Sequence, residues 1–596
     1  MKIDKKMLIP LIFAAGFVPT IVRAHLYYCG LNIFDWYPDV ANSQTDFFLY
    51  FKGIALVITA MIMAIILAYQ YSRKKLKINI LYGMVIAYGA CVLLSGLFSE
   101  YRSFAFKGSY EVFESVPVIL AYLIVSYYAY VVVSNGADVK WLMTGIGIGY
   151  LLVTLIGFFQ VFGIDFFRSS IGKHLITPTI MWDNLDTLSF TFQKGVSYAT
   201  LYNTNYLAQY YGISIPIITM LIFGVKEYKQ KILLLIIDII SVVTLVGSGS
   251  KSGLIVLLFV TVIGLLIYKS GDWKKTFIVG GTVIVLLAGA FVYRYGGVAN
   301  LMAAINGSNM QSTEYALTDI ETTDENVKFV INNKELFVSY VTAEDNTTAF
   351  ITCMDSDGND LPYDETKGDE FTKVLQDTSY GNCSVKPVLI DDKIAICVNI
   401  DEQEYYFSNQ IDGKYYYYNA AGKYVKFPHN EKTNLFSDSM FSGRGLIWNN
   451  IIPKLKKCLL FGTGANTFVM EYPQDNYIYK TYSGVQYVFD VKAHSMYFQQ
   501  FLENGLIALL LILAICLYYI ITSFVLYLKI KENTFESCLG KGCFLGIIAY
   551  LVVCLTNDSN VNTAPVFWAM LGIGVAVNEM LKKELVKKEQ AEANGK

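Results

Sequence analysis

The chain has 596 residues, of which 54% are apolar, 15% are aromatic and only 16% are charged. Soluble globular proteins carry roughly 25% charged residues, so this composition argues against a soluble enzyme or a disordered protein and predicts a membrane protein. The formal net charge of −2 conceals an uneven distribution. The segment 312–429 holds 22 Asp and Glu against 9 Lys and no Arg, a net charge of −13, whereas the remaining chain is basic and apolar.

Apolar stretches long enough to cross about 30 Å of hydrocarbon recur along the sequence. They predict an α-helical polytopic membrane protein with about 12 transmembrane helices, at residues 7–22, 54–71, 78–98, 116–134, 141–163, 206–223, 232–247, 253–268, 276–293, 506–528, 543–555 and 564–580. The first stretch also resembles the apolar part of a signal peptide. No small-x-small cleavage site follows it, and Arg23 stands where the small residue should be, so we interpret it as a span.

The loops between these stretches predict the orientation of the chain. Every second loop is short and rich in Lys and Arg, and the positive-inside rule assigns such loops to the cytoplasm. Both termini are then cytoplasmic, and residues 297–505 are extracytoplasmic. All four histidines fall in external segments in this arrangement: His25, His174, His429 and His494.

The sequence pattern divides the chain into four regions. Residues 1–300 form a membrane domain with the first nine spans, and residues 506–596 hold the last three spans and a cytoplasmic tail. Between them, residues 312–429 show alternating runs of four to seven residues separated by Asn-Asn, Asp-Gly and Ala-Gly turn signals. This pattern predicts a small all-β insert. Residues 430–505 return to a helical pattern and form an extracytoplasmic loop that we expect to be catalytic.

Three features of the insert have more than one interpretation. The run Tyr415 to Tyr418 suits either sugar binding through aromatic faces or cross-strand packing, and packing is the simpler interpretation. The triplet Asp355-Ser356-Asp357 is typical of a turn. The three cysteines of the insert, Cys353, Cys383 and Cys397, can form at most one disulfide. No His or Cys spacing in the chain indicates a metal site.

The helical loop carries the most specific motifs in the chain. They are Ser442-Gly443-Arg444 followed by Trp448, the turn Gly462-Thr463-Gly464, and Ala493-His494 followed by Glu503-Asn504-Gly505. Together they resemble the signature of the O-antigen ligase and O-antigen polymerase superfamily. The fold that this resemblance implies is a GT-C-like membrane protein.

The resemblance extends upstream to residue 159 and leaves out the acidic insert. Gln160 and Gly163 match a Gln-x-x-Gly at the end of a span, and Asn203-Thr204-Asn205 resembles an Asn-Pro-Asn segment that enters the next span. The run 249–253, Gly-Ser-Lys-Ser-Gly, resembles a Ser-Arg-Gly turn between two later spans. Two residues depart from the family pattern: Thr204 replaces Pro, and Lys251 replaces an Arg that the family uses toward phosphate.

The resemblance implies a glycosyltransferase of the bacterial cytoplasmic membrane. Such a protein moves an oligosaccharide from a polyprenyl diphosphate carrier to a hydroxyl acceptor at the outer face of the membrane, without a metal or another cofactor and with inversion at the sugar. The implied partners are the lipid-linked glycan donor, a glycan, cell-wall or lipid acceptor, and membrane lipids, but no nucleic acid. Ligase and polymerase use the same donor and differ in the acceptor, so both remain open.

The chemistry of this reaction assigns roles to individual residues. The diphosphate leaving group needs fixed cations, and Arg444 offers a planar, permanently charged fork, with Lys251 as a weaker second cation. The acceptor hydroxyl must lose a proton, and His494 is the candidate base because a neutral imidazole suits that step near pH 7. We expect further contacts to the diphosphate or glycan from Asn203, Asn205, Gln160 and Trp448, although an Asn at a helix entrance is equally a helix cap.

Two other classes of protein also fit the composition. A transferase that uses a polyprenyl monophosphate sugar would need a carboxylate base in the first external loop, where Asp35, Asp39 and Asp46 lie. A lipid-linked oligosaccharide flippase or other transporter is the second class. Transporters commonly contain internal repeats and charges within their spans, and the sequence has no clear repeat.

Overall fold

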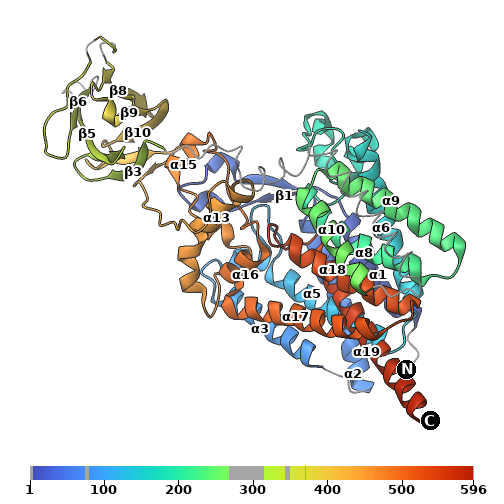
Figure 1. The fold of residues 1–596 in the computed structure, drawn as a ribbon. Coiled ribbons are helices and arrows are strands. Elements are labelled where there is room, and N and C mark those ends of the chain that lie inside the picture. Colours follow the sequence, from blue (N-terminus) through green and yellow to red (C-terminus); the bar gives the residue numbers. More distant parts are fainter. Residues whose placement is uncertain are drawn as a thin grey trace.

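The computed structural model describes residues 4–73, 79–267, 315–342, 349–364, 366–368 and 371–594. Figure 1 shows a large helical body with a smaller group of β-strands beyond one end of it. The N- and C-termini lie close together at the end of the body remote from the sheets. These strands, between residues 317 and 425, therefore lie apart from the main helical body.

Nine helices among the described residues are long and apolar enough to cross a membrane. They are α2 (Tyr50–Arg73), α3 (Ile80–Phe98), α5 (Val116–Ser134), α6 (Val139–Val161), α8 (Thr204–Gly224), α9 (Tyr228–Ser248), α17 (Leu506–Lys529), α18 (Phe535–Val553) and α19 (Ala564–Asn594). A shorter apolar helix, α10, covers Lys251–Ile267. These helices make the chain a multi-pass membrane protein.

The predicted count of 12 spans is only partly matched. Nine predicted spans correspond to the nine long helices, and the predicted span at 253–268 corresponds to α10. The span expected at 7–22 is a succession of short helical turns, with α1 at Ile9–Ile12, a π-helical turn at Phe13–Phe17 and a 3₁₀ turn at Val18–Thr20. Pro10 and Pro19 lie in this segment and remove two backbone donors. The span expected at 276–293 lies outside the described residues.

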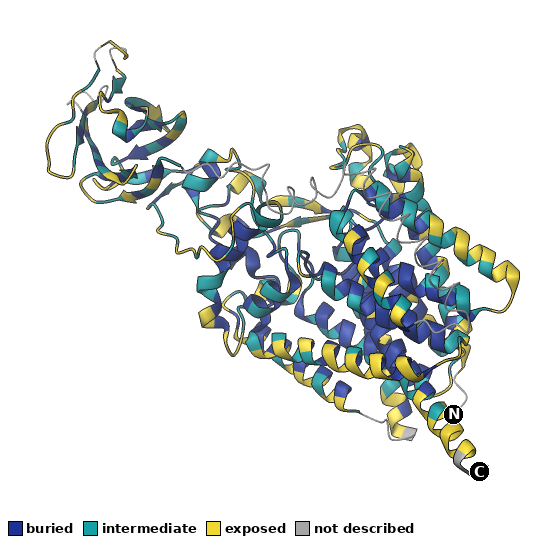
Figure 2. Cartoon of the chain, in the orientation of Figure 1, coloured by how far each residue is buried: buried dark blue, intermediate teal, exposed yellow. Residues whose placement is uncertain are grey.

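The core of the helical body consists of four helices that are buried almost all round. Helix α8 packs against α18, and α5 packs against α19. Figure 2 shows that α9 and α17 instead keep one exposed face. Because these exposed residues are apolar, such as Leu233 in α9 and Leu510 in α17, we interpret their faces as surfaces toward lipid.

The β-strands between residues 317 and 425 form two antiparallel sheets. The first has the order β3-β4-β5-β6, with β3 (Leu317–Thr322), β4 (Val327–Ile331), β5 (Lys334–Thr342) and β6 (Ala349–Met354). The second has the order β12-β11-β10-β9-β8-β7, with β7 (Lys373–Val374), β8 (Cys383–Ile390), β9 (Lys393–Ile400), β10 (Gln403–Ser408), β11 (Tyr416–Tyr418) and β12 (Tyr424–Val425). We call these two sheets the β module.

The ambiguous features of the β module have structural roles. Tyr415 and Tyr417 are buried in its core, which supports packing rather than sugar binding at these two positions. Asp355 accepts hydrogen bonds from the backbone N–H groups of Asp357 and Asn359, as expected for a turn. Cys353, Cys383 and Cys397 are all buried and free.

Six short helices and a small hairpin complete the described fold. The helices are α4 (Arg102–Lys107), α7 (Ser170–Ile176), α13 (Met440–Leu455), α14 (Phe468–Glu471), α15 (Tyr477–Tyr482) and α16 (Met496–Asn504). The hairpin pairs β1 (His25–Tyr28) with β2 (Ser43–Asp46). In Figure 1, α13, α15 and α16 lie between the β module and the spanning helices.

Close packing of α19 on α5 depends on a glycine. A Cβ atom at Gly572 would lie 2.1 Å from the backbone oxygen of Ser126, whereas a Cβ at Gly147 in α6 would meet nothing within 4 Å. We expect Gly572→Ala to destabilise the protein by about 1–3 kcal/mol, because the helices must separate. Gly147→Ala is the matched control and should leave the melting temperature unchanged or raise it. Thermal unfolding of the detergent-purified protein measures both, and equal effects would contradict this packing.

Candidate functional site

His494 lies in a short connection that several contacts hold in place. Its backbone is left-handed, with φ = 50°, and it precedes Ser495, the N-cap of α16. The backbone oxygen of Ala493 accepts a hydrogen bond of 2.9 Å from the indole Nε1 of Trp448, and the backbone N–H of Ala493 donates to Gln499 Oε1 at 3.3 Å. The N–H of Met496 donates to backbone oxygens of Cys554 and Asn557. The His494 position is therefore fixed from both sides.

The partner of His494 is Asp558, which the sequence motifs did not identify. The distance from His494 Nδ1 to Asp558 Oδ2 is 3.4 Å, and the side chain of His494 is 41% exposed whereas that of Asp558 is 2% exposed. Asp558 lies in the loop between α18 and α19. Its second oxygen, Oδ1, is buried without a hydrogen-bond partner among the described residues. The polar run 556–560, Thr-Asn-Asp-Ser-Asn, between two apolar stretches is the sequence signal that could have revealed it.

Buried polar side chains hold the loop that carries Asp558. Gln209 in α8 donates from Nε2 to the backbone oxygen of Asp558 at 2.7 Å and accepts from Asn560 Nδ2 at 2.7 Å. The ammonium group of Lys52, fully buried in α2, donates to the backbone oxygen of Thr200 and to Asn562 Oδ1. Since buried polar groups are stable only when they are hydrogen-bonded, this network fixes the loop against α2 and α8.

Arg444 lies near the same carboxylate. It follows three residues of α13 with left-handed backbone, Phe441, Ser442 and Gly443, and its Nη1 donates to the backbone oxygen of Phe441 at 2.8 Å. Its Nε is buried without a hydrogen-bond partner among the described residues. Burial lowers the pKa of Arg444, and the negative charge of Asp558 opposes that shift. An arginine remains charged under these conditions, so the guanidinium is a fixed cation with an unused donor.

A second buried cation, Lys492, was also missed from the sequence. Its ammonium donates to Tyr206 Oη at 2.7 Å and lies 5.6 Å and 5.3 Å from the ring centres of Tyr202 and Tyr206. Lys492 is 6% exposed, and the Glu114 carboxyl is close enough to interact electrostatically with its ammonium. The Lys492 ammonium, in contact with a hydroxyl and two aromatic rings, is therefore a candidate partner for an incoming anion.

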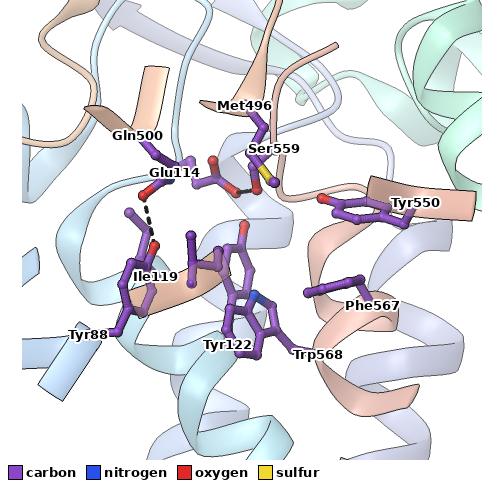
Figure 3. A pocket seen from close by; sticks show the side chains of 11 residues that line it. Tyr88, Glu114, Ile119, Tyr122, Met496, Gln500, Tyr550, Ser559, Phe567 and Trp568 are labelled. Carbon is purple, nitrogen blue, oxygen red and sulfur yellow. Dashed lines mark hydrogen bonds between the residues drawn. The ribbon is translucent and has the colours of Figure 1, made fainter. Parts of the chain in front are cut away.

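A second acidic group, Glu114, contacts the loop that carries Asp558. Figure 3 shows Glu114 beside Ser559, among Tyr122, Tyr550 and Trp568. Ser559 Oγ donates to Glu114 Oε1 at 2.8 Å. Burial of the carboxyl group raises the pKa of Glu114 to about 7, with the hydrogen bond from Ser559 opposing the shift. Glu114 therefore changes its protonation near neutral pH.

The turn Gly462-Thr463-Gly464 and the triplet Glu503-Asn504-Gly505 contact each other. The N–H groups of Thr463 and Gly464 donate to the backbone oxygens of Leu502 and Glu503 at 2.9 Å and 2.8 Å. A Cβ at Gly462 would lie 2.1 Å from the Glu503 carbonyl carbon. Burial raises the pKa of Glu503 to about 8. These two motifs therefore anchor the C-terminal end of α16 rather than provide exposed reactive groups.

Of the remaining predicted residues, three stabilise local structure. Gln160 is 1% exposed, and its Oε1 accepts from the N–H groups of Tyr198 and Ala199. Asn203 is the N-cap of α8, because its side chain accepts from the N–H of Asn205. Trp448 is 5% exposed and contacts the chain beside His494. In this structure Gln160 and Trp448 position other groups and are covered by protein.

Lys251 and Asn205 belong to two motifs that the fold brings together. Lys251 is the first residue of α10, directly after a turn in which Gly249 has a left-handed backbone. Ser250 Oγ donates to Asn205 Oδ1 at 3.2 Å. Tyr206, next to Asn205, accepts the hydrogen bond from Lys492. Two of the motifs recognised in the sequence thus converge on the segment that carries His494.

Comparisons with known proteins add no family to this description. A scan against models of protein families, a search of curated proteins and a search of solved structures each find no match. The fold itself defines a multi-pass membrane protein with a separate β module, and the site pairs a half-exposed histidine with a buried carboxylate beside two cations.

The raised pKa of Glu114 predicts how stability depends on pH. Between the ordinary Glu pKa of 4.5 and about 7, the folded protein holds a proton that the unfolded chain has released. Raising the pH through this window therefore lowers the free energy of unfolding. We expect the melting temperature of Glu114→Gln to fall less than that of the wild type between pH 5 and pH 8. Glu325→Gln, on the surface of the β module, is the control. If the melting temperature of Glu114→Gln fell as steeply with pH as that of the wild type, the raised pKa of Glu114 would be contradicted.

Proposed function

We propose that this protein transfers an oligosaccharide from a polyprenyl diphosphate carrier to a hydroxyl group at the outer face of a bacterial cytoplasmic membrane, as the resemblance to O-antigen ligases and polymerases implies. The observation that carries this proposal is the contact between His494 and the buried Asp558, beside Arg444 and Lys492. A base and two cations are the groups that such a transfer requires.

In the proposed reaction, the acceptor oxygen attacks the first sugar carbon while the bond from that carbon to the diphosphate oxygen breaks. The acceptor proton passes to Nε2 of His494, because Nδ1 faces Asp558 at 3.4 Å. The Asp558 carboxylate orients the imidazole and stabilises the imidazolium that forms. Direct displacement at one carbon inverts its configuration.

The leaving diphosphate gains negative charge as its bond to the sugar breaks. Arg444 supplies a planar cation with a free Nε donor, and Lys492 supplies a second cation two residues before His494. Fixed cations in a poorly hydrated site stabilise such a charge more strongly than water does. Lys251, at the start of α10, remains a third candidate.

The contacts of the first external loop favour this reaction over one that uses a carboxylate base there. Asp46 Oδ2 accepts from the N–H groups of Leu49 and Tyr50 and so caps α2. The side chain of Asp39 lies 3.3 Å from the ammonium of Lys423 in the β module. Asp46 is thus committed to capping α2, and Asp39, 71% exposed, has only a surface ion pair, whereas His494 is oriented by a buried carboxylate.

His494→Ala tests the assignment of the base. We expect the release of polyprenyl diphosphate from a lipid-linked donor to fall by about 10²–10⁴-fold, since a positioned general base contributes a factor of that size. The reaction is measured with protein reconstituted in liposomes. His174→Ala, an exposed histidine of α7, is the control and should retain full activity. Retained release in His494→Ala would reject the histidine as the base. Release of polyprenyl monophosphate from a monophosphate-linked sugar, lost in Asp39→Asn, would favour the monophosphate-sugar transferase, and donor movement between leaflets without release would favour a flippase.

Arg444→Lys tests the cation at the diphosphate. The substitution keeps the charge and removes the planar fork, and we expect kcat/KM for the donor to fall by about 10- to 100-fold, the cost of losing a charged hydrogen bond. Lys492→Met should cause a loss of similar size. Lys251→Met is the comparison, and a larger loss in Lys251→Met than in the other two would reverse our ranking of the cations.

A further inference from the structure

A large cleft separates the β module from the helical segment that carries Arg444. Its volume is about 1330 Å³, and its walls come from β3 and neighbouring turns on one side and from α13, α15 and residues 427–439 on the other. Sites for small ligands enclose roughly 300–1,000 Å³, so this cleft has room for a chain of several units. In Figure 1, α15 and α13 lie between the sheets and the spanning helices.

The two walls of the cleft are firmly connected. Tyr477 of α15 belongs to the hydrophobic core of the β module, where its ring centre lies 4.9 Å from that of Tyr417. Asn419 in the β module donates to Tyr477 Oη at 3.0 Å and to the backbone oxygen of Asp35 in the first external loop at 2.9 Å. The cleft is therefore bounded by parts of the chain that hold each other in place.

Helix α13 presents opposite faces to the cleft and to the candidate site. Leu446 and Asn450 are four residues apart and line the cleft. Arg444 and Trp448 are also four residues apart, and successive helical residues turn by about 100°, so this second pair lies on the other side of the helix. One short helix thus separates the cleft from the residues that act on the donor.

A buried polar group of the cleft has an unused hydrogen-bonding position. Asn450 is 1% exposed; its Nδ2 donates to the backbone oxygen of Leu446 at 2.9 Å, whereas its Oδ1 has no hydrogen-bond partner among the described residues. Such an oxygen is costly to bury and is satisfied when a donor, such as a sugar hydroxyl, enters. Tyr479 adds an aromatic ring to the same cleft.

The charges around the cleft select the kind of glycan. Its lining holds four carboxylates, one ammonium group and one imidazole, from Asp319, Asp401, Asp438, Asp475, Lys432 and His429, and the imidazole Nδ1 lies 4.0 Å from an Asp319 oxygen. The ammonium of Lys432 lies 3.2 Å from Asp438, so it neutralises one carboxylate. An acidic polysaccharide would meet repulsion from the other three, whereas uncharged sugars can donate hydroxyl hydrogens to carboxylate and amide oxygens.

We propose that this cleft binds a non-acidic oligosaccharide, which serves as the acceptor chain of the transfer. The role as acceptor rests on the proposed function, whereas the binding of the glycan does not. The chain lies against α13 on the side opposite to Arg444, with its reactive end beyond the N-terminus of that helix. The β module then selects acceptors by charge.

Binding is tested with the full-length protein in nanodiscs. Surface polysaccharide of the source organism is hydrolysed to oligosaccharides and separated by anion exchange into an uncharged and an acidic fraction, and binding is followed by calorimetry. We expect the uncharged fraction to bind more tightly than the acidic one. Tyr479→Ala should weaken binding about tenfold, as for a residue at the centre of an interface. Tyr416→Ala, in β11 outside the cleft, is the aromatic control and should bind as the wild type does.

A charge reversal provides a second, independent variant. Asp319→Lys should improve binding of the acidic fraction, while Asp357→Lys, an equal change of charge in an exposed turn outside the cleft, should not.

The proposal would be overturned if the wild type bound the acidic fraction more tightly, or if it bound neither fraction. It would also be overturned if Tyr479→Ala and Tyr416→Ala lost affinity equally. Glycan binding without release of polyprenyl diphosphate would refute the proposed function alone. Normal release with an unchanged acceptor KM in Tyr479→Ala would refute the acceptor cleft alone.

Discussion

Hydrocarbon offers no hydrogen bonds, and this constraint decides where polar chemistry can lie in this protein. Each polar or charged group within the helical body must find a partner in the protein, at a cost of several kcal/mol if it does not. Lys52 is the clearest case, because its buried ammonium reaches both the loop before α8 and the loop before α19. Helix packing and loop positions around the site depend on satisfying such groups.

The same constraint explains why the candidate site is built from loops at the ends of helices. His494 precedes α16, Asp558 follows α18, Lys251 begins α10, and Asn205 lies in the first turn of α8. Each residue is held by backbone or side-chain contacts from another segment, as Trp448 holds Ala493. Rigid helices thus position reactive side chains that could not be stable in the middle of a span.

The β module obeys the ordinary rules of a water-soluble domain. Strand β4 alternates buried and partly exposed residues, the core contains Phe329, Tyr405 and Phe407, and the many acidic residues lie mostly on the surface. Its contacts with the loop that carries Asp35 and with α15 join it to the helical body. The uneven charge of the chain therefore coincides with the boundary between an apolar body and a solvated module.

The sequence by itself determined the nine long spanning helices and the β-rich nature of the insert, because both depend on local periodicity and on continuous apolar length. It also marked Arg444 and His494, since their motifs are local. Only the tertiary structure decided that Asp558 pairs with His494 and that the Lys492 ammonium donates to Tyr206. The first pair is 64 positions apart along the chain and the second is 286 positions apart. The broken helix at residues 9–20 and the support roles of Gln160 and Trp448 likewise depend on neighbours that local periodicity does not specify.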